Sequence, residues 1–498
     1  MKTKLKTNLL SKLLTAALLA ASSAFAETQP VTVTVADDGT GAELAPRFIG
    51  LSYEMSMLLP KEGRYYFDKN DQALLNTFKT LNVKSLRVGA NAVDDPRIEI
   101  PQEKDIDVFF SFARAAGVKV IYSFRLKDGK PADSARLASY IASRYSDLLE
   151  CFSIGNEPDF YIKTYAEYMA QWKPHYDAIL KAVPGAKFLG PSTTLGHYEL
   201  EFAKEMFPTG NLLMLGNHHY FLGSGRAGET NPPATRARFL SNKRLSEYEK
   251  KYDRVAGPLA AQGVPLRMDE LNSCFNGGAK DSSDTYASTL WVLDFTHWWA
   301  ARHIVGFNFH TGESVGRDGK FGAPNYAAFL RQDSGVGFSM RPLAYGLLAF
   351  NQGAQGRPLG VKLKAAPKFD FNAHAYRDRA GVVYLTLINK SYDAHAETAA
   401  VSLQLPTNMG AVKLQRMELT QKNHDVAAKT DVMLGGVAVD PQGNWAGQWQ
   451  DIAAASDQTM TIQVSPASAT LLRCSPVGMT QSKPSGEAAV TPRPSSSL

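Results

Sequence analysis

Short apolar runs alternate along most of this chain with longer segments whose apolar residues recur at helical spacing. Runs such as 118–124 are largely apolar on both faces, which is typical of parallel strands covered by helices on both sides. Between residues 48 and 356 this alternation predicts an α/β fold, a (β/α)8 TIM barrel. The expected strands are 48–54, 83–88, 118–124, 151–154, 187–190, 212–220, 264–270 and 304–310, and the expected helices are 71–81, 105–116, 133–145, 165–182, 199–206, 242–261, 284–301 and 342–352.

The helical spacing disappears after residue 353, and short β-rich runs separated by turn residues follow it. This pattern predicts a C-terminal antiparallel β-sandwich domain over residues 357–476. Residues 31–35 also alternate with period two, and because a lone strand is not stable we expect the segment 27–47 to join the sandwich. Residues 477–498 are rich in Pro, Ser, Thr and Gly, which predicts a disordered tail. The expected sandwich runs are 361–363, 373–376, 382–388, 400–405, 412–419 and 459–464.

The first 26 residues resemble a cleaved signal peptide. Four lysines precede an apolar run at 13–21, and Ala24-Phe25-Ala26 fits a small-residue cleavage site. The run is too short to anchor the chain in a bilayer, and we expect no membrane span elsewhere. We therefore expect a mature chain that starts near Glu27 and is secreted or periplasmic.

Charge and cysteine content exclude several classes of protein. Without the four signal lysines the formal net charge falls from +6 to +2, which gives no argument for nucleic acid binding. An acidic substrate would have to be held by local groups. The cysteines Cys151, Cys274 and Cys474 are too few for a disulfide scaffold, and we expect buried free thiols at Cys151 and Cys274. We expect a monomer.

Two glutamates mark the ends of predicted barrel strands. Glu157, in Asn156-Glu157-Pro158, ends the fourth strand, and Glu270 ends the seventh. Barrel enzymes carry their chemistry at the carboxyl ends of the strands. Two carboxylates there can act as acid/base and nucleophile on a glycosidic bond, with retention if they lie about 5–5.5 Å apart and inversion at about 6.5–9.5 Å.

Asn156 and Tyr220 are the expected partners of these carboxylates. Asn156 can hydrogen-bond a sugar 2-OH, and this bond strengthens as charge develops on the ring. Tyr220 ends the sixth strand, where its hydroxyl can donate to Glu270 and keep it ionised.

Other polar residues at the strand ends have less specific interpretations. Glu54 ends the first strand and Asn91 follows the second, and each is either a sugar contact or a rim residue. We expect His310 to line the mouth without a catalytic role. Asp269 should point away from Glu270 and be structural, because neighbouring strand residues face opposite sides.

The adjacent His218 and His219 look like a metal motif, but on a strand they face opposite sides. No further ligand in the sequence completes a zinc set. The chain also has no phosphate-binding glycine loop, no nucleophilic Ser elbow and no calcium loop. We therefore expect no metal and no cofactor.

The chain resembles glycoside hydrolase family 79, the β-glucuronidases and heparanases, from about residue 48 to residue 474. The resemblance is carried by 48–54 (FIGLSYE), 154–159 (IGNEPD), 217–220 (NHHY) and 269–285, where a glycine loop and a helix start follow the glutamate. It implies a glucuronide or glycosaminoglycan substrate and a retaining mechanism. The implied residues are Glu157 as acid/base, Glu270 as nucleophile, Asn156 and Tyr220 as their partners, Glu54 and Asn91 as sugar contacts, and Tyr326 as a contact of the glucuronate carboxylate.

The chain departs from the family at two positions. Pro324 replaces a glycine two residues before Tyr326 and has no N–H, so a neighbour such as Gly322 would have to supply the backbone contact to the carboxylate. Phe275 replaces a tyrosine, which removes one polar contact. The excised linker of animal heparanases has no counterpart, and we expect a single unprocessed chain.

The loop 311–323, with Arg317 and Lys320, could close the cleft for exo action or contact a sulfated or uronic chain. The favoured function is a retaining β-glucuronidase, exo or heparanase-like endo. The alternatives are another retaining clan-A β-glycosidase of xylosidase or endoglucanase type, or a non-catalytic carbohydrate-binding barrel.

Overall fold

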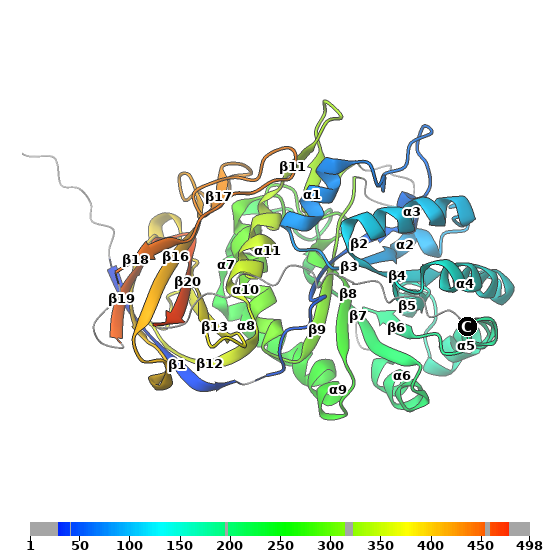
Figure 1. Cartoon of the computed structure of the whole chain (residues 1–498), viewed down its shortest axis with the longest axis horizontal. Helices are drawn as coiled ribbons and strands as arrows, with labels where there is room; N and C mark the ends of the chain where they lie inside the picture. Colours follow the sequence, from blue (N-terminus) through cyan, green and yellow to red (C-terminus); the bar gives the residue numbers. More distant parts are fainter. Residues whose placement is uncertain (1–27, 40, 195–197, 314–321, 454–458, 478–498) are drawn as a thin grey trace, which may run out of the picture.

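The computed structural model describes residues 28–39, 41–194, 198–313, 322–453 and 459–477 (Figure 1). The expected signal peptide, the tail beyond residue 477 and most of the loop 311–323 lie outside these residues. No helix in the described ranges has the length and apolar character needed to cross a membrane.

Eight parallel strands close into a barrel in which each strand pairs with its neighbours in chain order. This confirms the predicted TIM-barrel fold. The sixth and seventh barrel strands extend beyond their predicted ends at residues 220 and 270. They pair with each other in the added part, for example at Leu222 and Cys274. The strands are β2 (Ile49–Glu54), β3 (Ser85–Gly89), β4 (Lys119–Phe124), β5 (Leu149–Ile154), β6 (Phe188–Thr193), β7 (Leu212–Ser224), β8 (Leu266–Phe275) and β9 (Ile304–His310).

Helices cover the outside of the barrel (Figure 1). Their starts follow local sequence signals: Asp71 accepts a hydrogen bond from Leu74 N at the first helix, and Thr164 and Glu167 form a capping box at the fifth. The helices that match predicted ones are α1 (Gln72–Thr80), α3 (Glu103–Ala116), α4 (Pro131–Tyr145), α5 (Tyr165–Ala182), α6 (Glu199–Met206), α10 (Tyr286–Ala300) and α11 (Pro342–Gly353), and a short α2 (Ala90–Val93) follows β3.

The long helix predicted over 242–261 is confirmed in extent, but it contains a π-helical turn that the pattern does not predict. A helix that the pattern does not predict comes first, where Asn231 accepts from Ala234 N and two prolines occupy the first turn. Within the predicted range the hydrogen bonding changes to a π-helical turn just before Pro258, which has no N–H to continue the α-helical ladder, and the backbone stays helical throughout. The elements are α7 (Pro232–Leu240), α8 (Leu245–Lys251), a π-helical turn (Tyr252–Ala256) and α9 (Gly257–Ala261).

The second domain is a ten-stranded sheet built from residues before and after the barrel. As predicted, the N-terminal strand β1 (Thr28–Gly39) belongs to it. β1 is antiparallel to β12 but parallel to β15, so the sheet is not antiparallel throughout. The sequence pattern does not predict β17, β18 or β20. The other strands are β12 (Arg357–Lys364), β13 (Phe371–Arg377), β14 (Val383–Asn389), β15 (Thr398–Gln404), β16 (Val412–Gln421), β17 (Val432–Leu434), β18 (Gln450–Ile452), β19 (Thr459–Val464) and β20 (Ser468–Pro476), and a separate hairpin is formed by β10 (Phe329–Arg331) and β11 (Phe338–Met340).

The barrel and the sheet share a hydrophobic core. Every residue of α10 is buried, which explains why this helix has no polar face. Ile388 and Leu471 on two adjacent sheet strands join the barrel core, whereas Leu385 and Leu472 on the same strands point into a second core inside the sheet domain. Cys151 and Cys274 are buried free thiols, as predicted, and Cys474 is also buried and free.

Candidate active site

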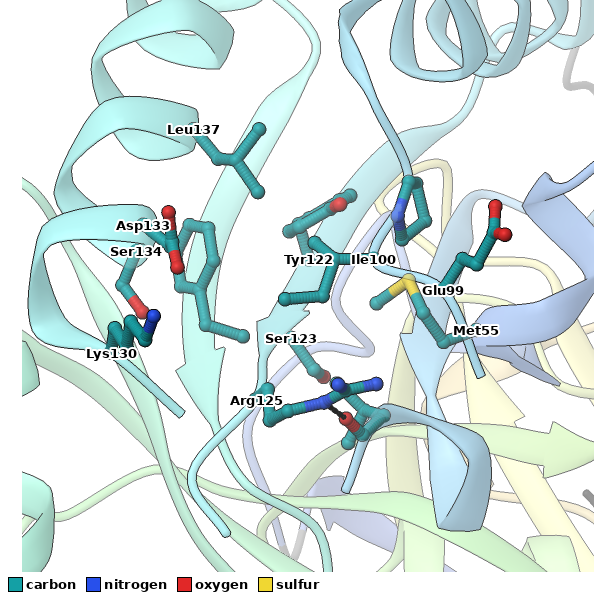
Figure 2. A pocket seen from close by; sticks show the side chains of 13 residues that line it. Met55, Glu99, Ile100, Tyr122, Ser123, Arg125, Lys130, Asp133, Ser134 and Leu137 are labelled. Atoms are coloured by element: carbon teal, nitrogen blue, oxygen red, sulfur yellow. Dashed lines mark hydrogen bonds between the residues drawn. The ribbon is translucent and has the colours of Figure 1, made fainter. Parts of the chain in front are cut away.

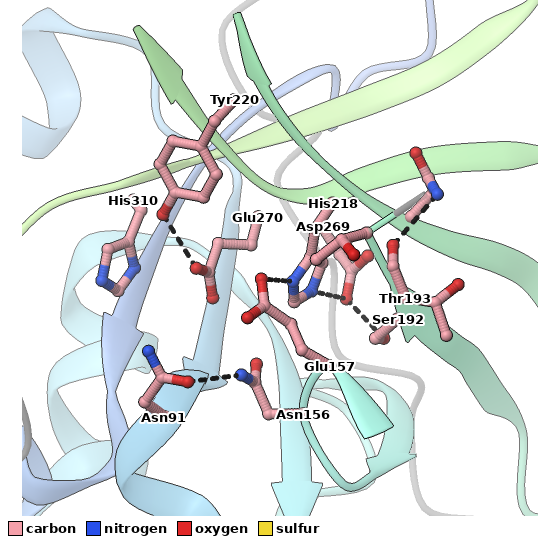
Figure 3. Close-up of polar contacts among 12 residues, drawn as sticks. Asn91, Asn156, Glu157, Ser192, Thr193, His218, Tyr220, Asp269, Glu270 and His310 are labelled. Atoms are coloured by element: carbon pink, nitrogen blue, oxygen red, sulfur yellow. Dashed lines mark hydrogen bonds and ion pairs between the residues drawn. The ribbon is translucent and has the colours of Figure 1, made fainter. Parts of the chain in front are cut away.

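Two buried glutamates lie close together at the carboxyl end of the barrel (Figure 3). Glu157 follows β5, the fourth barrel strand, and Glu270 lies in β8, the seventh. Their exposed fractions are only 9% and 3%. One carboxylate oxygen of Glu157 and one of Glu270 lie within 4.8 Å of each other. This distance is closer to the separation of a retaining pair, about 5–5.5 Å, than to that of an inverting pair, roughly 6.5–9.5 Å.

The backbone of Glu157 is held in an unusual conformation. Its φ of 45° and ψ of 50° are left-handed, and Gly155 two residues earlier also has a positive φ, 82°. The N–H of Glu157 donates to the carbonyl of Ser192 on β6 at 3.1 Å. A non-glycine residue in this region costs on the order of 1–3 kcal/mol, and such strain is characteristic of functional sites. The strained turn aims Glu157 across the barrel mouth.

Arg87 on β3 is fully buried and joins the two halves of the site. Its guanidinium donates to Oε2 of Glu270 at 2.6 Å and to Oδ1 of Asn156 at 2.7 Å. A third hydrogen bond, of 3.0 Å, goes to Oγ of Ser52. The planar guanidinium therefore fixes the orientation of Glu270 relative to Asn156, and a lysine ammonium could not reproduce this fork.

Glu270 is held as a carboxylate. Burial raises its pKa, but His310, His218, Arg87 and the hydroxyl of Tyr220 together lower the pKa to about 2. Burial also lowers the pKa of His310. Arg87 and His218 therefore provide the positive charge beside Glu270 at neutral pH. The Tyr220 hydroxyl donates to Oε1 of Glu270 at 2.9 Å, as predicted from the sequence.

Glu157 has the opposite electrostatic environment. Burial raises its pKa, and the hydrogen bond from His218 only partly offsets this effect. Nδ1 of His218 lies 2.9 Å from Oε1 of Glu157. Burial lowers the pKa of His218, but the charges of Asp269 and Glu270 raise it to about 10. The two carboxyl groups thus have pKa values displaced in opposite directions, which is the arrangement that separates an acid from a nucleophile.

Asp269 belongs to the same polar network, so the prediction that it points away from the site is wrong. Its Oδ2 accepts from Ser192 Oγ at 2.7 Å and lies 3.5 Å from Nε2 of His218 and 3.8 Å from Nε of Arg87. The pairing of β8 with both neighbours shifts register near this position, and simple alternation fails there. Asp269 positions His218 and does not itself reach the mouth (Figure 3).

Asn156 and Asn91 lie beside each other, with Nδ2 of Asn156 donating to Oδ1 of Asn91 at 3.3 Å. The backbone N–H of Asn156 donates to Asp94 at 2.9 Å. Asn91 is exposed and Asn156 is buried, so the pair leads from the two glutamates to the solvent. This placement suits contacts to sugar hydroxyls.

Glu54 and His310 form the wall next to Glu270. Oε2 of Glu54 accepts from Ala92 N at 2.7 Å, and its Oε1 lies 3.9 Å from Nε2 of His310. Burial raises the pKa of Glu54 to about 8, despite the hydrogen bond from Ala92. Glu54 is therefore a neutral carboxylic acid near pH 7, able to donate as well as accept.

Tyr326 is brought to the site by the loop after β9. It is buried, and its ring centroid lies 6.3 Å from that of Tyr220 and 6.0 Å from that of His310. The glycine loop after Glu270 packs directly on it, because a Cβ on Gly278 would lie 2.9 Å from Tyr326 N. Phe275, at the end of β8, is 42% exposed and its ring lies 6.3 Å from that of Tyr220.

The barrel brings Glu157, Glu270 and His218 within 4.8 Å, a set that the sequence did not reveal as potential metal ligands. Their ligand atoms are already engaged: His218 bonds to Glu157, and Glu270 accepts from Arg87 and Tyr220. A permanent guanidinium charge beside Glu270 also repels a cation. The arrangement fits a hydrogen-bonded acid pair better than a metal centre.

Sequence reasoning brought Glu157, Glu270 and Tyr220 together correctly but missed Arg87 altogether. The available signal was an arginine in the middle of a predicted buried strand, since a buried charge requires a partner. His218 was considered only as a metal ligand. The prediction that it and His219 face opposite sides is confirmed, because His219 contacts Lys251 and stacks on Phe295 outside the barrel.

A second depression lies beside β4 and is too small for a substrate (Figure 2). Its volume is about 20 Å³, enough for roughly one water molecule. Met55, Ile100 and Leu137 make much of its wall apolar, and Arg125 at its base is bound to Val93 O at 2.8 Å. The candidate site is therefore the cluster around the two glutamates.

Comparisons of the sequence with known proteins give a curated relative. No protein-family model matches the chain. The chain is 23% identical over 471 residues to a β-glucuronidase of Aspergillus niger, with 79% of this chain and 83% of the fungal protein covered.

Solved structures resemble the chain over nearly their whole length. A 4-O-α-L-rhamnosyl-β-D-glucuronidase from Fusarium oxysporum 12S has a TM-score of 0.68 at 16% identity, covering 88% of this chain and 99% of that one. A family 51 arabinofuranosidase from Xanthomonas axonopodis pv. citri has 0.63 at 15% identity (90% and 100% covered), and a family 44 xyloglucanase from Paenibacillus polymyxa has 0.58 at 11% (90% and 100%). The chain therefore has the barrel-plus-sheet fold of these glycoside hydrolases.

Proposed function

We propose that this protein is a retaining β-glucuronidase in which Glu270 is the nucleophile and Glu157 the acid/base. The observation that carries the proposal is the pair itself: two buried carboxyl groups with oxygens within 4.8 Å and pKa values displaced in opposite directions. A short separation supports retention through a covalent intermediate, since the nucleophile must reach the anomeric carbon directly.

In the first step, Oε of ionised Glu270 attacks the anomeric carbon while protonated Glu157 gives its proton to the leaving glycosidic oxygen. The bond from that carbon to the aglycone oxygen breaks, and a glycosyl ester of Glu270 forms. In the second step Glu157, now ionised, takes a proton from water as the water oxygen displaces Glu270. Each group thereby returns to its starting protonation state.

The neighbouring side chains set the protonation states that this cycle needs. Arg87 and Tyr220 keep Glu270 ionised and oriented through hydrogen bonds of 2.6 and 2.9 Å. His218 holds Glu157 in place and, because its cation is paired with Asp269, stabilises Glu157 once it has lost its proton. Asn156, fixed by Arg87, is the proposed contact to the sugar 2-OH.

The choice of glucuronide rests on two supports. The curated relative from Aspergillus niger and the structural neighbour from Fusarium oxysporum both have β-glucuronidase names. In this chain, the Tyr326 side chain sits between the glycine loop and His310, where a C5 carboxylate could accept its hydroxyl proton. Glu54 and Asn91 are the proposed contacts to the remaining hydroxyls.

We also propose that the enzyme is exported from the cytoplasm. A cleavable N-terminal segment of 26 residues would place the enzyme in the periplasm or outside the cell, where glucuronide-bearing polysaccharides are found. Edman sequencing of the protein recovered after export tests this, with Glu27 as the predicted first residue and an intact Met1 as the contradictory result.

Hydrolysis of p-nitrophenyl glycosides tests the proposed specificity. Release of p-nitrophenol from the β-D-glucuronide, with at least a hundredfold lower kcat/KM on the β-D-xyloside and β-D-glucoside, is the predicted result. A preference for the xyloside or glucoside would replace the proposal with another clan-A β-glycosidase. The Glu270→Ala variant should lose turnover but still bind the glucuronide, and binding without turnover in the wild type would indicate a non-catalytic barrel.

Product sizing after digestion of heparan sulfate and of a short glucuronide separates the two modes of action. Free glucuronic acid as the sole product means exo cleavage, and shorter oligosaccharides mean endo cleavage.

A further inference from the structure

A polar cavity of about 360 Å³ lies where the barrel meets the sheet domain, remote from the two glutamates. Its walls include Thr80 at the end of α1, Gln352 near the end of α11, and Tyr384 and Arg473 on β14 and β20. Barrel helices run antiparallel to the strands, so the carboxyl ends of α1 and α11 mark the face opposite the catalytic mouth. The volume falls within the range of small-ligand sites, about 300–1,000 Å³.

Two aromatic side chains line this cavity. Trp449 precedes β18 and is half-buried, and Tyr384 is 9% exposed. The Tyr384 hydroxyl is occupied, since it donates to Asp378 at 3.3 Å, so the tyrosine offers mainly ring surface. Aromatic rings of this kind provide flat apolar area at low entropic cost, which suits the C–H face of a sugar ring.

The remaining neutral wall is rich in primary amides. Asn82, Asn351, Gln352 and Gln355 all line the cavity. An amide carries two donors and a carbonyl acceptor, so it can satisfy both roles of a hydroxyl group. Asn351 and Gln355 each use one donor on a backbone carbonyl, of Leu81 and of Asn351, and within the described ranges they keep their second donor and their acceptor. Aromatic area combined with several amides is a lining for a polyhydroxylated ligand and not for an apolar one.

Among the described residues of the wall, the charged ones are both cationic, Lys79 and Arg473, and none is a carboxylate. Nε of Arg473 is buried without a hydrogen-bond partner in the described part of the chain. Arginine matches a carboxylate with two parallel N–H groups, and charge-assisted hydrogen bonds of this type are the strong ones. The wall therefore favours an anionic group on the ligand.

We propose that this cavity is a second carbohydrate site that binds one sugar residue carrying a carboxylate, a uronic acid. The ring would pack on Trp449, its hydroxyls would meet the amides, and its carboxylate would meet Arg473 and Lys79. The lining of the cavity supports this second site whichever glycoside the barrel cleaves. A site on the far face would hold an acidic polysaccharide without occupying the catalytic mouth.

The test uses the full chain labelled with 5-fluorotryptophan. Trp449→Phe identifies the Trp449 signal among the six tryptophans in the ¹⁹F NMR spectrum. Sodium D-glucuronate should shift this signal saturably, and D-glucose should bind at least tenfold more weakly. Inorganic phosphate should shift the Trp449 signal less than glucuronate does, and it should bind more weakly than glucuronate. Equal binding of glucose would overturn carboxylate recognition, equal binding of phosphate would leave a plain anion site, and an unmoved Trp449 signal would remove the site.

Variants that remove one positive charge from the cavity separate a loss of binding from a loss of folding. Lys79→Met and Arg473→Met should each weaken glucuronate binding at Trp449 at least fivefold and leave hydrolysis at the barrel mouth unchanged. Because Lys79 is exposed, Lys79→Met should also leave thermal unfolding unchanged. Lys181→Met, on the exposed end of α5, is the matched control and should bind like the parent. Parental binding in both cavity variants would refute the assignment of the carboxylate partner.

Discussion

Nη1 of Arg87 lies 2.6 Å from Oε2 of Glu270, and both side chains are buried. A buried carboxylate without this partner would favour its neutral form, which is a poor nucleophile. The same guanidinium also holds Asn156, so one residue controls both the charge of Glu270 and the position of the neighbouring amide.

Arg87→Lys and Arg87→Met separate these two effects. Arg87→Lys keeps a charge but loses the fork, and kcat on the β-glucuronide should fall on the order of 10²-fold with little change in the acid limb of the pH profile. Arg87→Met should lower kcat further and move the acid limb to higher pH, because the pKa of Glu270 rises without the guanidinium. An unchanged acid limb in a folded Arg87→Met protein would contradict the assigned role.

His218→Gln tests the control of Glu157. His218 lowers the pKa of Glu157, so its loss should raise that pKa and move the basic limb of kcat/KM to higher pH. The second step should slow by about 10–100-fold, because ionised Glu157 loses its cationic partner. His219→Gln is the matched control, since His219 faces Lys251 outside the barrel, and it should leave both limbs in place. A basic limb that moves down in His218→Gln would reverse the proposed relationship.

Tyr326→Phe tests recognition of the sugar carboxylate. A hydrogen bond to a charged group contributes about 1.5–3 kcal/mol, so kcat/KM on the β-glucuronide should fall by roughly 10–100-fold. Any residual rate on the β-glucoside should stay constant. Tyr345→Phe, whose hydroxyl contacts Val439 N at 3.1 Å, is the control that removes a hydroxyl elsewhere. An equal loss on both substrates would show that Tyr326 supports the site without reading the carboxylate.

Glu54→Gln tests the neutral state of Glu54 through the pH dependence of stability. The pKa of Glu54 is raised from 4.5 to about 8, so folding favours its protonated form. This contribution is complete below pH 4.5 and is lost as the pH rises through 8. The Tm of Glu54→Gln should therefore rise relative to the Tm of the wild type as the pH increases from 4.5 to 8. A constant difference in Tm over that range would mean that Glu54 is ionised in the native state.

The alternating strands and helices of the barrel were predictable from the sequence, because apolar residues follow a different spacing in buried strands than in amphipathic helices. The positions of Glu157 just after the fourth barrel strand and of Glu270 on the seventh followed from that rhythm, which is why the two glutamates could be paired across the barrel. Tyr220 followed as well, from its place on the sixth barrel strand next to the strand that carries Glu270. The π-helical turn inside the helix over residues 242–261 was not predicted, although Gly257-Pro258 directly after it was a signal.

The polar network behind the glutamates depends on tertiary geometry that alternation does not encode. Asp269 turns toward His218 only because β8 shifts register against its neighbours. Arg87 reaches Glu270 from a strand distant in sequence, and a single arginine in SLRVG gives no indication of its partner. The cavity at Trp449 likewise forms only when α1, α11 and the sheet domain come together.

Trapping the covalent intermediate tests the central claim most directly. A 2-deoxy-2-fluoro-β-D-glucuronyl fluoride slows breakdown of the glycosyl-enzyme, and peptide mass spectrometry then locates the sugar. The predicted result is one fluoroglucuronyl group on Glu270, formed faster than with the corresponding glucosyl fluoride. An adduct on another residue, or turnover that releases the inverted anomer without any adduct, would contradict a retaining β-glucuronidase with Glu270 as its nucleophile.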